Sequence, residues 1–153
     1  MSVVKLWLAN TLNRAITLHF GNEGLPGRTF VEMLFQLRTA PKLQRRPDFA
    51  FVSYERWPKD HDMPSTAAWH VAPDLVVEVV SPNDSAVEVM EKINQYFQAG
   101  IEEVWVLYPR TRNAFIFQST TKVTALDAAG ILEGGRILPG FTLPLADLIP
   151  GSA

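Results

Sequence analysis

Two carboxylates within otherwise apolar segments are the residues of this sequence with the clearest chemical potential. Glu78 lies in PDLVVEVV (residues 73–80) with two valines on each side, and Asp48 directly precedes the apolar run FAFV. Burying an ionised carboxylate costs free energy unless it is paired or bound to a metal. A third acid, Asp74, follows a proline at the start of its segment, where an acid commonly caps a turn, and capping is the interpretation we favour for it.

Both segments are predicted to be β-strands that present their acids on one face, because side chains alternate across a strand. Glu78 would share its face with Val76 and Val80, and Asp48 would share its face with small residues of the strand predicted over 48–53. Carboxylates brought together in a partly buried place raise each other's pKa unless a cation lies between them. Hard oxygen ligands suit Mg²⁺ or Mn²⁺. On the strand pattern alone, a metal-binding and a purely structural role for Glu78 are both open.

A helix is predicted over residues 85–99, directly after the second of these strands. Ser85 and Glu88 match the S-x-x-E capping box, and Gly100 stands where a helix would end. Because strands are predicted on both sides of it, this helix indicates a β-α-β crossover with at least one parallel pair of strands.

Lys92 lies at the border of the apolar face of this helix, from which a lysine can extend its ammonium group towards the sheet. The pattern equally suits an ordinary i,i+4 pair with Glu88 on a solvated face, and on the pattern alone we favour that pair. Gln95, close to the same border, is either a ligand-side amide or plain surface. The apolar centre of the helix is predicted to consist of Val89, Met90, Ile93, Tyr96 and Phe97.

The rest of the chain supplies the elements that must position these residues. An amphipathic helix is predicted near the N-terminus, with an apolar face formed by Val4, Leu8, Leu12, Ala15 and Ile16, with Trp7 beside them. Strand-forming residues fill 28–38 and 102–109, a loop is expected over 58–73, and residues 113–128 indicate a hairpin. The tail is expected to add a short strand and a helical turn. We therefore predict one mixed α/β (α+β) domain over residues 1–153, built around a central mixed sheet.

Composition excludes several classes of protein. The chain has 153 residues, a net charge of −2 and no cysteine, so neither a disulfide framework nor a thiolate metal site is possible. No segment approaches the length of a membrane span, and no signal peptide is recognisable, so we expect a cytoplasmic protein without a membrane partner. The weakly acidic balance does not by itself indicate nucleic acid, although a local basic patch can accompany an acidic site.

Four segments in a consistent order resemble one known family: RRPDFAFVS, PDLVVEVVSPNDS, EKINQYFQAGIEEVWVLYP and ILPGFTLPLADL. The chain is similar to the Uma-two family of endonucleases in the restriction-endonuclease-like PD-(D/E)xK superfamily. The resemblance implies a restriction-endonuclease-like core with an N-terminal helix and a crossover helix. It also implies a Mg²⁺ (or Mn²⁺) site formed by Asp48 and Glu78, DNA as the substrate, and hydrolysis of phosphodiester bonds. A homodimer is a further expectation.

The resemblance also assigns a role to Lys92. Val80 occupies the position of the superfamily's catalytic lysine, and the family is similar in using a lysine on the following helix instead, which makes Lys92 the third catalytic candidate. Asp74 and Gln95 remain weaker candidates near the site. Arg38, Arg45 and Arg46 are either contacts for flanking phosphates or a solvated loop.

Two departures from the family pattern leave other functions open. The strand pair that family members usually place before the first helix is expected to be absent here, and Tyr108 stands where the family has an aspartate. The alternatives are a catalytically degenerate module of the same fold that binds nucleic acid or a protein, and an oligomer that pairs exposed sheet edges.

Overall fold

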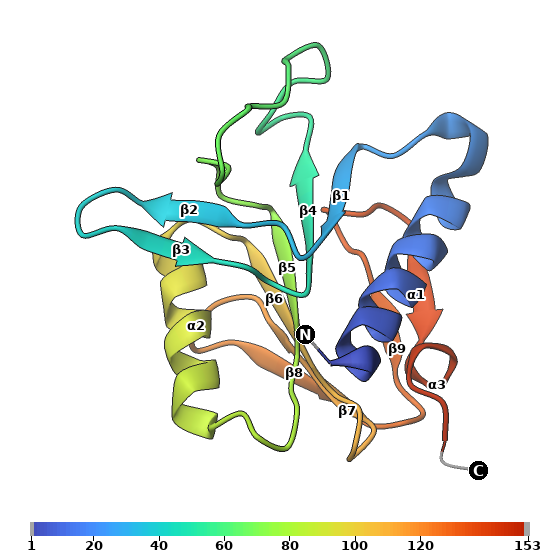
Figure 1. Ribbon diagram of the computed structural model, residues 1–153. Coiled ribbons are helices and arrows are strands. Elements are labelled where there is room, and N and C mark those ends of the chain that lie inside the picture. Colours follow the sequence, from blue (N-terminus) through green and yellow to red (C-terminus); the bar gives the residue numbers. More distant parts are fainter. Residues whose placement is uncertain (1, 152–153) are drawn as a thin grey trace.

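A central mixed sheet carries helices on both faces (Figure 1). The computed structural model describes residues 2–151. Its helices are α1 (Val3–Phe20), the 3-10 turn η1 (Gly21–Glu23), α2 (Ala86–Gln98) and α3 (Leu145–Leu148). Its strands are β1 (Gly27–Val31), β2 (Phe35–Arg38), β3 (Leu43–Arg45), β4 (Phe49–Ser53), β5 (Leu75–Val79), β6 (Glu103–Tyr108), β7 (Asn113–Phe117), β8 (Val123–Leu126), β9 (Ile131–Glu133) and β10 (Thr142–Pro144).

The main sheet has the strand order β1-β4-β5-β6-β7-β8. β5 and β6 are parallel and are joined through α2, whereas the other neighbouring pairs are antiparallel. The predicted crossover and the predicted hairpin, β7–β8, are thus both confirmed. Two further pairs, β2–β3 and β9–β10, form small separate sheets.

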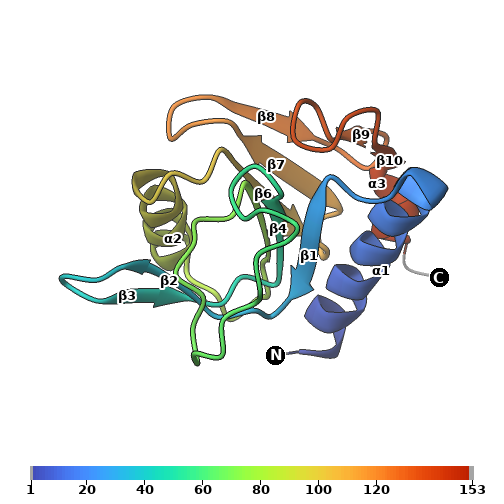
Figure 2. The ribbon, with the colours of Figure 1, turned by 90° about the horizontal axis from the view of Figure 1, so that it is seen from above.

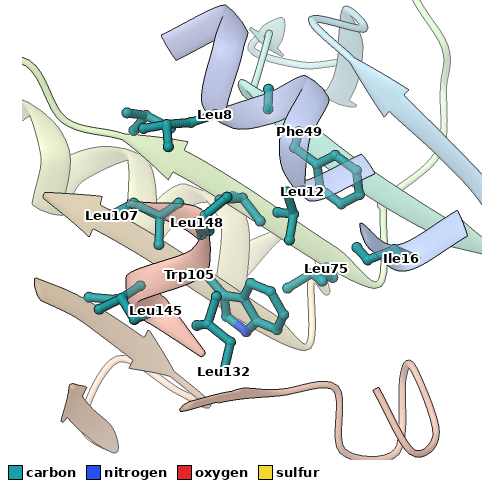
Figure 3. Close-up of a cluster of buried hydrophobic side chains, with 14 of the residues drawn as sticks. Leu8, Leu12, Ile16, Phe49, Leu75, Trp105, Leu107, Leu132, Leu145 and Leu148 are labelled. Atoms are coloured by element: carbon teal, nitrogen blue, oxygen red, sulfur yellow. The ribbon is translucent and has the colours of Figure 1, made fainter. Parts of the chain in front are cut away.

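The two faces of the sheet are covered by different elements (Figure 2). On one face, α1, α3 and β9 pack over the strands and enclose the larger apolar core. Figure 3 shows that core, with side chains from α1, α3 and the sheet converging on Trp105. On the other face, Ile93 and Tyr96 of α2 pack on Val76, Val104 and other strand residues. The result is a three-layer arrangement, helix–sheet–helix.

Alternation along β4 and β5 assigns each side chain to one of these two layers, as the sequence predicts. Phe49 and Val77 belong to the core beneath α1, whereas Val76 packs against α2. Asp48 and Glu78 fall in the alternate register and therefore lie on the α2 side of the sheet. The strand pattern thus directs two acids to the narrow space between the sheet and α2.

The amphipathic N-terminal helix is confirmed as α1, but its apolar face is shorter than expected. Leu8, Leu12 and Ile16 are buried, whereas Val4 is 53% exposed and Trp7 is 48% exposed. These two side chains line a surface cleft near the start of the helix, so their inclusion in the core was wrong. No helix in the described range is long and apolar enough to cross a membrane.

The predicted start of α2 is confirmed by its cap. The Ser85 side chain accepts a hydrogen bond from the backbone N–H of Glu88 (3.0 Å), and Gly100 follows the helix with φ 97°. Ile93 and Tyr96 are buried as expected, but Met90 is 42% exposed. The prediction that Met90 belongs to the apolar centre of this helix was therefore wrong.

The strand-forming run over 28–38 is interrupted in the structure. At Glu32 the backbone takes φ 57°, an unusual value for a residue other than glycine, and the chain leaves the main sheet there. The following residues form the β2–β3 ribbon, which projects beside α2 (Figures 1 and 2). The backbone N–H of Glu32 donates to the carbonyl of Asp48 (3.3 Å), so the interruption lies directly beside one of the two acids.

Candidate active site

Asp48 and Glu78 lie next to each other on antiparallel strands. The register of β4 and β5 pairs Phe49 with Val77, so Asp48, directly before β4, comes opposite Glu78 of β5. Both are buried: Asp48 is 6% exposed and Glu78 is 8% exposed. The structure therefore brings these two predicted site residues together at the end of β5.

Each carboxylate is held by one short hydrogen bond. The backbone N–H of Val79 donates to Oδ2 of Asp48 at 2.7 Å. The hydroxyl of Tyr96, on α2, donates to Oε1 of Glu78. Tyr96 was predicted only as a core residue of α2, so its role as a hydrogen-bond donor to Glu78 is a feature that the sequence analysis missed. These bonds fix the orientation of both carboxyl groups.

Burial makes both acids reluctant to ionise. Burial raises the pKa of Glu78 to about 7; the Lys92 charge and the Tyr96 hydrogen bond oppose this rise, whereas the neighbouring Asp48 charge adds to it. Burial also raises the pKa of Asp48, against the effects of the Val79 N–H, Lys5 and Lys92. A cation between the two carboxylates would relieve this unfavourable electrostatic situation.

Lys92 is positioned to act on this pair of acids. Its side chain lines a small cavity of about 20 Å³ together with Glu78, Val80 and Asp84. Within residues 2–151, Lys92 makes neither an ion pair nor a side-chain hydrogen bond, so its ammonium group is not committed to another partner. Its charge lowers the pKa of both Asp48 and Glu78. The ordinary surface pair with Glu88 does not form within the described chain.

A second lysine, which the sequence analysis did not single out, approaches the acids from the other layer. Lys5 lies in the first turns of α1 and forms an ion pair with Asp84 (Nζ to Oδ2, 3.2 Å). Asp84 Oδ2 also accepts hydrogen bonds from the backbone N–H and the hydroxyl of Ser81. The Lys5 charge lowers the pKa of Asp48 more than the Lys92 charge does. The only hint of this role in the sequence is that Lys5 interrupts an apolar run.

Asp74 lies outside this cluster. It directly precedes β5 and lies four residues before Glu78, which corresponds to about 13 Å along a strand. Its carboxylate accepts hydrogen bonds from the backbone N–H and the hydroxyl of Ser53 (2.7 and 3.0 Å) and forms an ion pair with Arg56 (3.2 Å). These contacts agree with the interpretation of Asp74 as a residue that fixes the start of the strand.

Gln95 and the three arginines lie on and around the β2–β3 ribbon. Gln95 accepts a hydrogen bond from Arg45 Nε (2.8 Å), which links α2 to β3. Arg38 and Arg46 are exposed, and each donates one hydrogen bond to a backbone carbonyl, of Pro41 and Glu32 respectively. Their remaining N–H groups face solvent. Arg45 and Arg46 thus lie shortly before β4, whereas Arg38 lies at the far end of β2, beside the turn to β3.

The donor set of the site suits a small, hard divalent cation. Asp48 and Glu78 offer two carboxylates, and the residues of the described range contain no group of three or more potential ligands of the kind that holds a metal entirely by protein side chains. Mg²⁺ is commonly bound by one or two carboxylates, with waters and substrate phosphate completing its shell. The adjoining cavity has room for about one water molecule. The residues therefore fit Mg²⁺ or Mn²⁺.

Comparison with known proteins identifies the family and the fold of the chain. The model of the Uma2 family, described as "Putative restriction endonuclease", matches residues 2–146. A crystal structure described as "a putative nuclease belonging to DUF820" from Anabaena variabilis is similar with a TM-score of 0.81 and 17% sequence identity. The similarity covers 97% of this chain and 82% of that one, and it shows a shared restriction-endonuclease-like fold. No curated protein matches the chain significantly. From the family match over nearly its whole length, the chain belongs to the Uma2 family.

Proposed function

We propose that this protein is a divalent-metal-dependent endonuclease that hydrolyses phosphodiester bonds of DNA. The observation that carries the proposal is the burial of Asp48 and Glu78 side by side, with a pKa of about 7 for Glu78. Within the described residues, the buried charged side chains are these two acids and Asp74, and of the three only Asp74 has an ion-pair partner. Perturbed pKa values of this kind concentrate at functional sites. Membership of the Uma2 family supports the reaction class.

In this proposal Asp48 and Glu78 hold Mg²⁺ or Mn²⁺. When bound, the metal would act as a Lewis acid on the scissile phosphate and favour attack by water. The Val79 N–H and the Tyr96 hydroxyl keep the two carboxylates in position. Ionisation of Glu78, whose pKa is about 7, is needed before it can act as a charged ligand.

Lys92 would supply the positive charge that the sheet itself lacks. The position two residues after Glu78, which carries the lysine in the wider superfamily, is Val80, and its side chain packs towards α2. Lys92 lines the same cavity as Glu78 and Val80. From there its ammonium group can orient the attacking water or stabilise the charge that develops on the phosphate. Exposed Arg38 and Arg46 would contact flanking phosphates without regard to sequence.

Cleavage of supercoiled plasmid DNA tests the proposal. We expect nicking by the wild-type protein with Mg²⁺ or Mn²⁺ and none with EDTA. Glu78→Gln removes the charged ligand with little change of shape, and its nicking should fall to background. Glu91→Gln is the matched control. Glu91 is exposed on α2, and it does not line the cavity that contains Glu78.

Two results would contradict the proposal. Equal nicking by the wild type and Glu78→Gln would mean that the activity belongs to a contaminant or to another site. Absence of both nicking and metal-induced thermal stabilisation, together with salt-sensitive DNA binding, would favour a catalytically degenerate binding module. Tyr108, at the position of the family's aspartate, is the feature that gives this second function its weight.

A further inference from the structure

A cleft of about 480 Å³ opens beside the acid pair, and it contains no acidic residue. Three elements form it: the start of α1, the loop between β5 and α2, and the turn between β6 and β7. It shares Val79 and Val80 with the small cavity that contains Glu78. A ligand in the cleft would therefore lie directly beside the proposed metal site.

Two cationic side chains line this cleft, Lys5 from α1 and Arg110 from the β6–β7 turn. Arg110 is exposed and, within residues 2–151, forms no ion pair and no side-chain hydrogen bond, so its guanidinium is free to bind a ligand. Lys5 is held in place by the ion pair with Asp84, and its side chain is only 19% exposed. Both cations thus face a cleft whose lining contains no carboxylate; the nearest one is Asp84, which is already paired with Lys5, so Arg110 carries the uncompensated charge.

The backbone and the apolar residues of the cleft favour the same ligand. The N-terminal end of the 18-residue helix α1 faces the cleft through Ser2 and Val4, and the positive end of a helix dipole attracts anions. Pro82 and Pro109 add apolar surface between the two cations. A cleft with two cations, a helix N-terminus and apolar walls fits a phosphodiester, because the phosphate is anionic and the adjoining sugar has apolar faces.

We propose that Lys5 and Arg110 bind the backbone phosphate next to the scissile phosphate, in the cleft between α1 and the β6–β7 turn. This inference rests on the proposed nuclease function and assigns the path of the substrate strand beyond the metal site. The strand would run from the acid pair, past Val79 and Val80, into the cleft. Recognition there is of the phosphate and the sugar, so it carries no sequence preference.

Salt dependence of DNA binding tests this assignment. Binding of a fluorescently labelled DNA duplex would be measured by anisotropy across a range of KCl concentrations in Ca²⁺-containing buffer, with the intactness of the duplex checked after each titration. Each lost phosphate contact should make the slope of log K against log[salt] shallower by about 0.9. Because both cations bind one phosphate, we expect a change of up to this size for Lys5→Gln and for Arg110→Gln, with up to about eightfold weaker binding at 0.1 M salt.

Matched controls separate a local contact from a general loss of charge. Arg14→Gln removes a charge from an exposed position of α1 nine residues after Lys5, on about the opposite face of the helix, and Lys122→Gln does so in the β7–β8 turn. Both should leave the slope unchanged. Lys5→Arg should restore the wild-type slope, because it retains the charge and the pairing with Asp84. Thermal unfolding of every variant verifies folding.

The possible outcomes distinguish this inference from the function on which it rests. If the wild type binds DNA and Arg110→Gln has the same slope as Lys122→Gln, the phosphate site is refuted while the nuclease proposal stands. If the wild type shows no salt-dependent DNA binding, both are refuted. Lys5→Gln also leaves Asp84 without its ion-pair partner. Arg110 has no ion pair within the described chain, so Arg110→Gln has no such side effect.

Discussion

Replacing Glu78 by glutamine should stabilise the metal-free protein, and the gain should depend on pH. The pKa of Glu78 is about 7 in the folded protein, compared with 4.5 for an unperturbed glutamate. Between these values the folded state binds a proton that the unfolded state has lost, so stability falls as the pH rises from about 4.5 to about 7. Above pH 7 this loss of folding stability is complete. At about 1.4 kcal/mol per pKa unit, it amounts to about 3 kcal/mol.

Glutamine avoids this loss because it cannot ionise, and its side-chain oxygen can still accept the hydrogen bond from Tyr96. We therefore expect Glu78→Gln to be about 3 kcal/mol more stable than the wild type at pH 8, and less than about 1 kcal/mol more stable at pH 5. For a domain of this size, the difference at pH 8 corresponds to a rise in Tm of roughly 6–12 °C.

Urea unfolding in EDTA at pH 5 and pH 8 measures this effect. Glu91→Gln, on the exposed side of α2, should stay within about 0.5 kcal/mol of the wild type at both pH values. Adding Mg²⁺ should stabilise the wild type at pH 8 but not Glu78→Gln, since a metal that binds only the folded state shifts the unfolding equilibrium. A glutamine variant that is less stable than the wild type at pH 8, or equally stabilised at both pH values, would refute the reasoning.

Three further variants probe the parts of the fold that hold the site. Tyr96→Phe removes a hydrogen bond that lowers the pKa of Glu78, so the pH at which Mg²⁺ binding is half-maximal should rise by about one unit. An unchanged half-maximal pH would contradict this. Asp74→Ala should destabilise the protein by about 2–4 kcal/mol in urea unfolding, because it leaves the partly buried Ser53 N–H without its acceptor and removes one of the two ion pairs of Arg56. Mg²⁺ binding should persist under conditions in which the variant is folded. Gly27→Ala should cost at least about 2–3 kcal/mol, since its Cβ would lie 2.2 Å from the Val52 carbonyl oxygen; a variant as stable as the wild type would mean that β1 can shift.

The alternation of side chains was the part of the architecture most accessible from sequence. Alternation is a local property with a period of two, and it correctly assigned Asp48 and Glu78 to one face of two strands. The cap of α2 and the parallel pairing across the crossover followed from similarly local patterns. The unusual backbone at Glu32 could not be predicted, because a positive φ at this residue depends on contacts with the chain around Asp48.

The remaining members of the site arise from tertiary contacts that no local pattern encodes. Lys5 and Asp84 are 79 residues apart in the chain and meet only because α1 packs across the end of β5. Tyr96 satisfies the pattern of an apolar helix face, so its hydroxyl gave no sign that it would donate to Glu78. The catalytic role of Lys92 was predicted only from the resemblance to a family. The helical pattern of the sequence alone favoured a solvent-exposed ion pair with Glu88.

The most direct test of the central claim is an anomalous difference map from a crystal soaked in Mn²⁺ at pH 8, where Glu78 is largely ionised. The account predicts a peak between the carboxylates of Asp48 and Glu78, and loss of that peak in Glu78→Gln. Density that appears instead at Asp84 and Glu88, or a site that stays empty at saturating Mn²⁺, would contradict it.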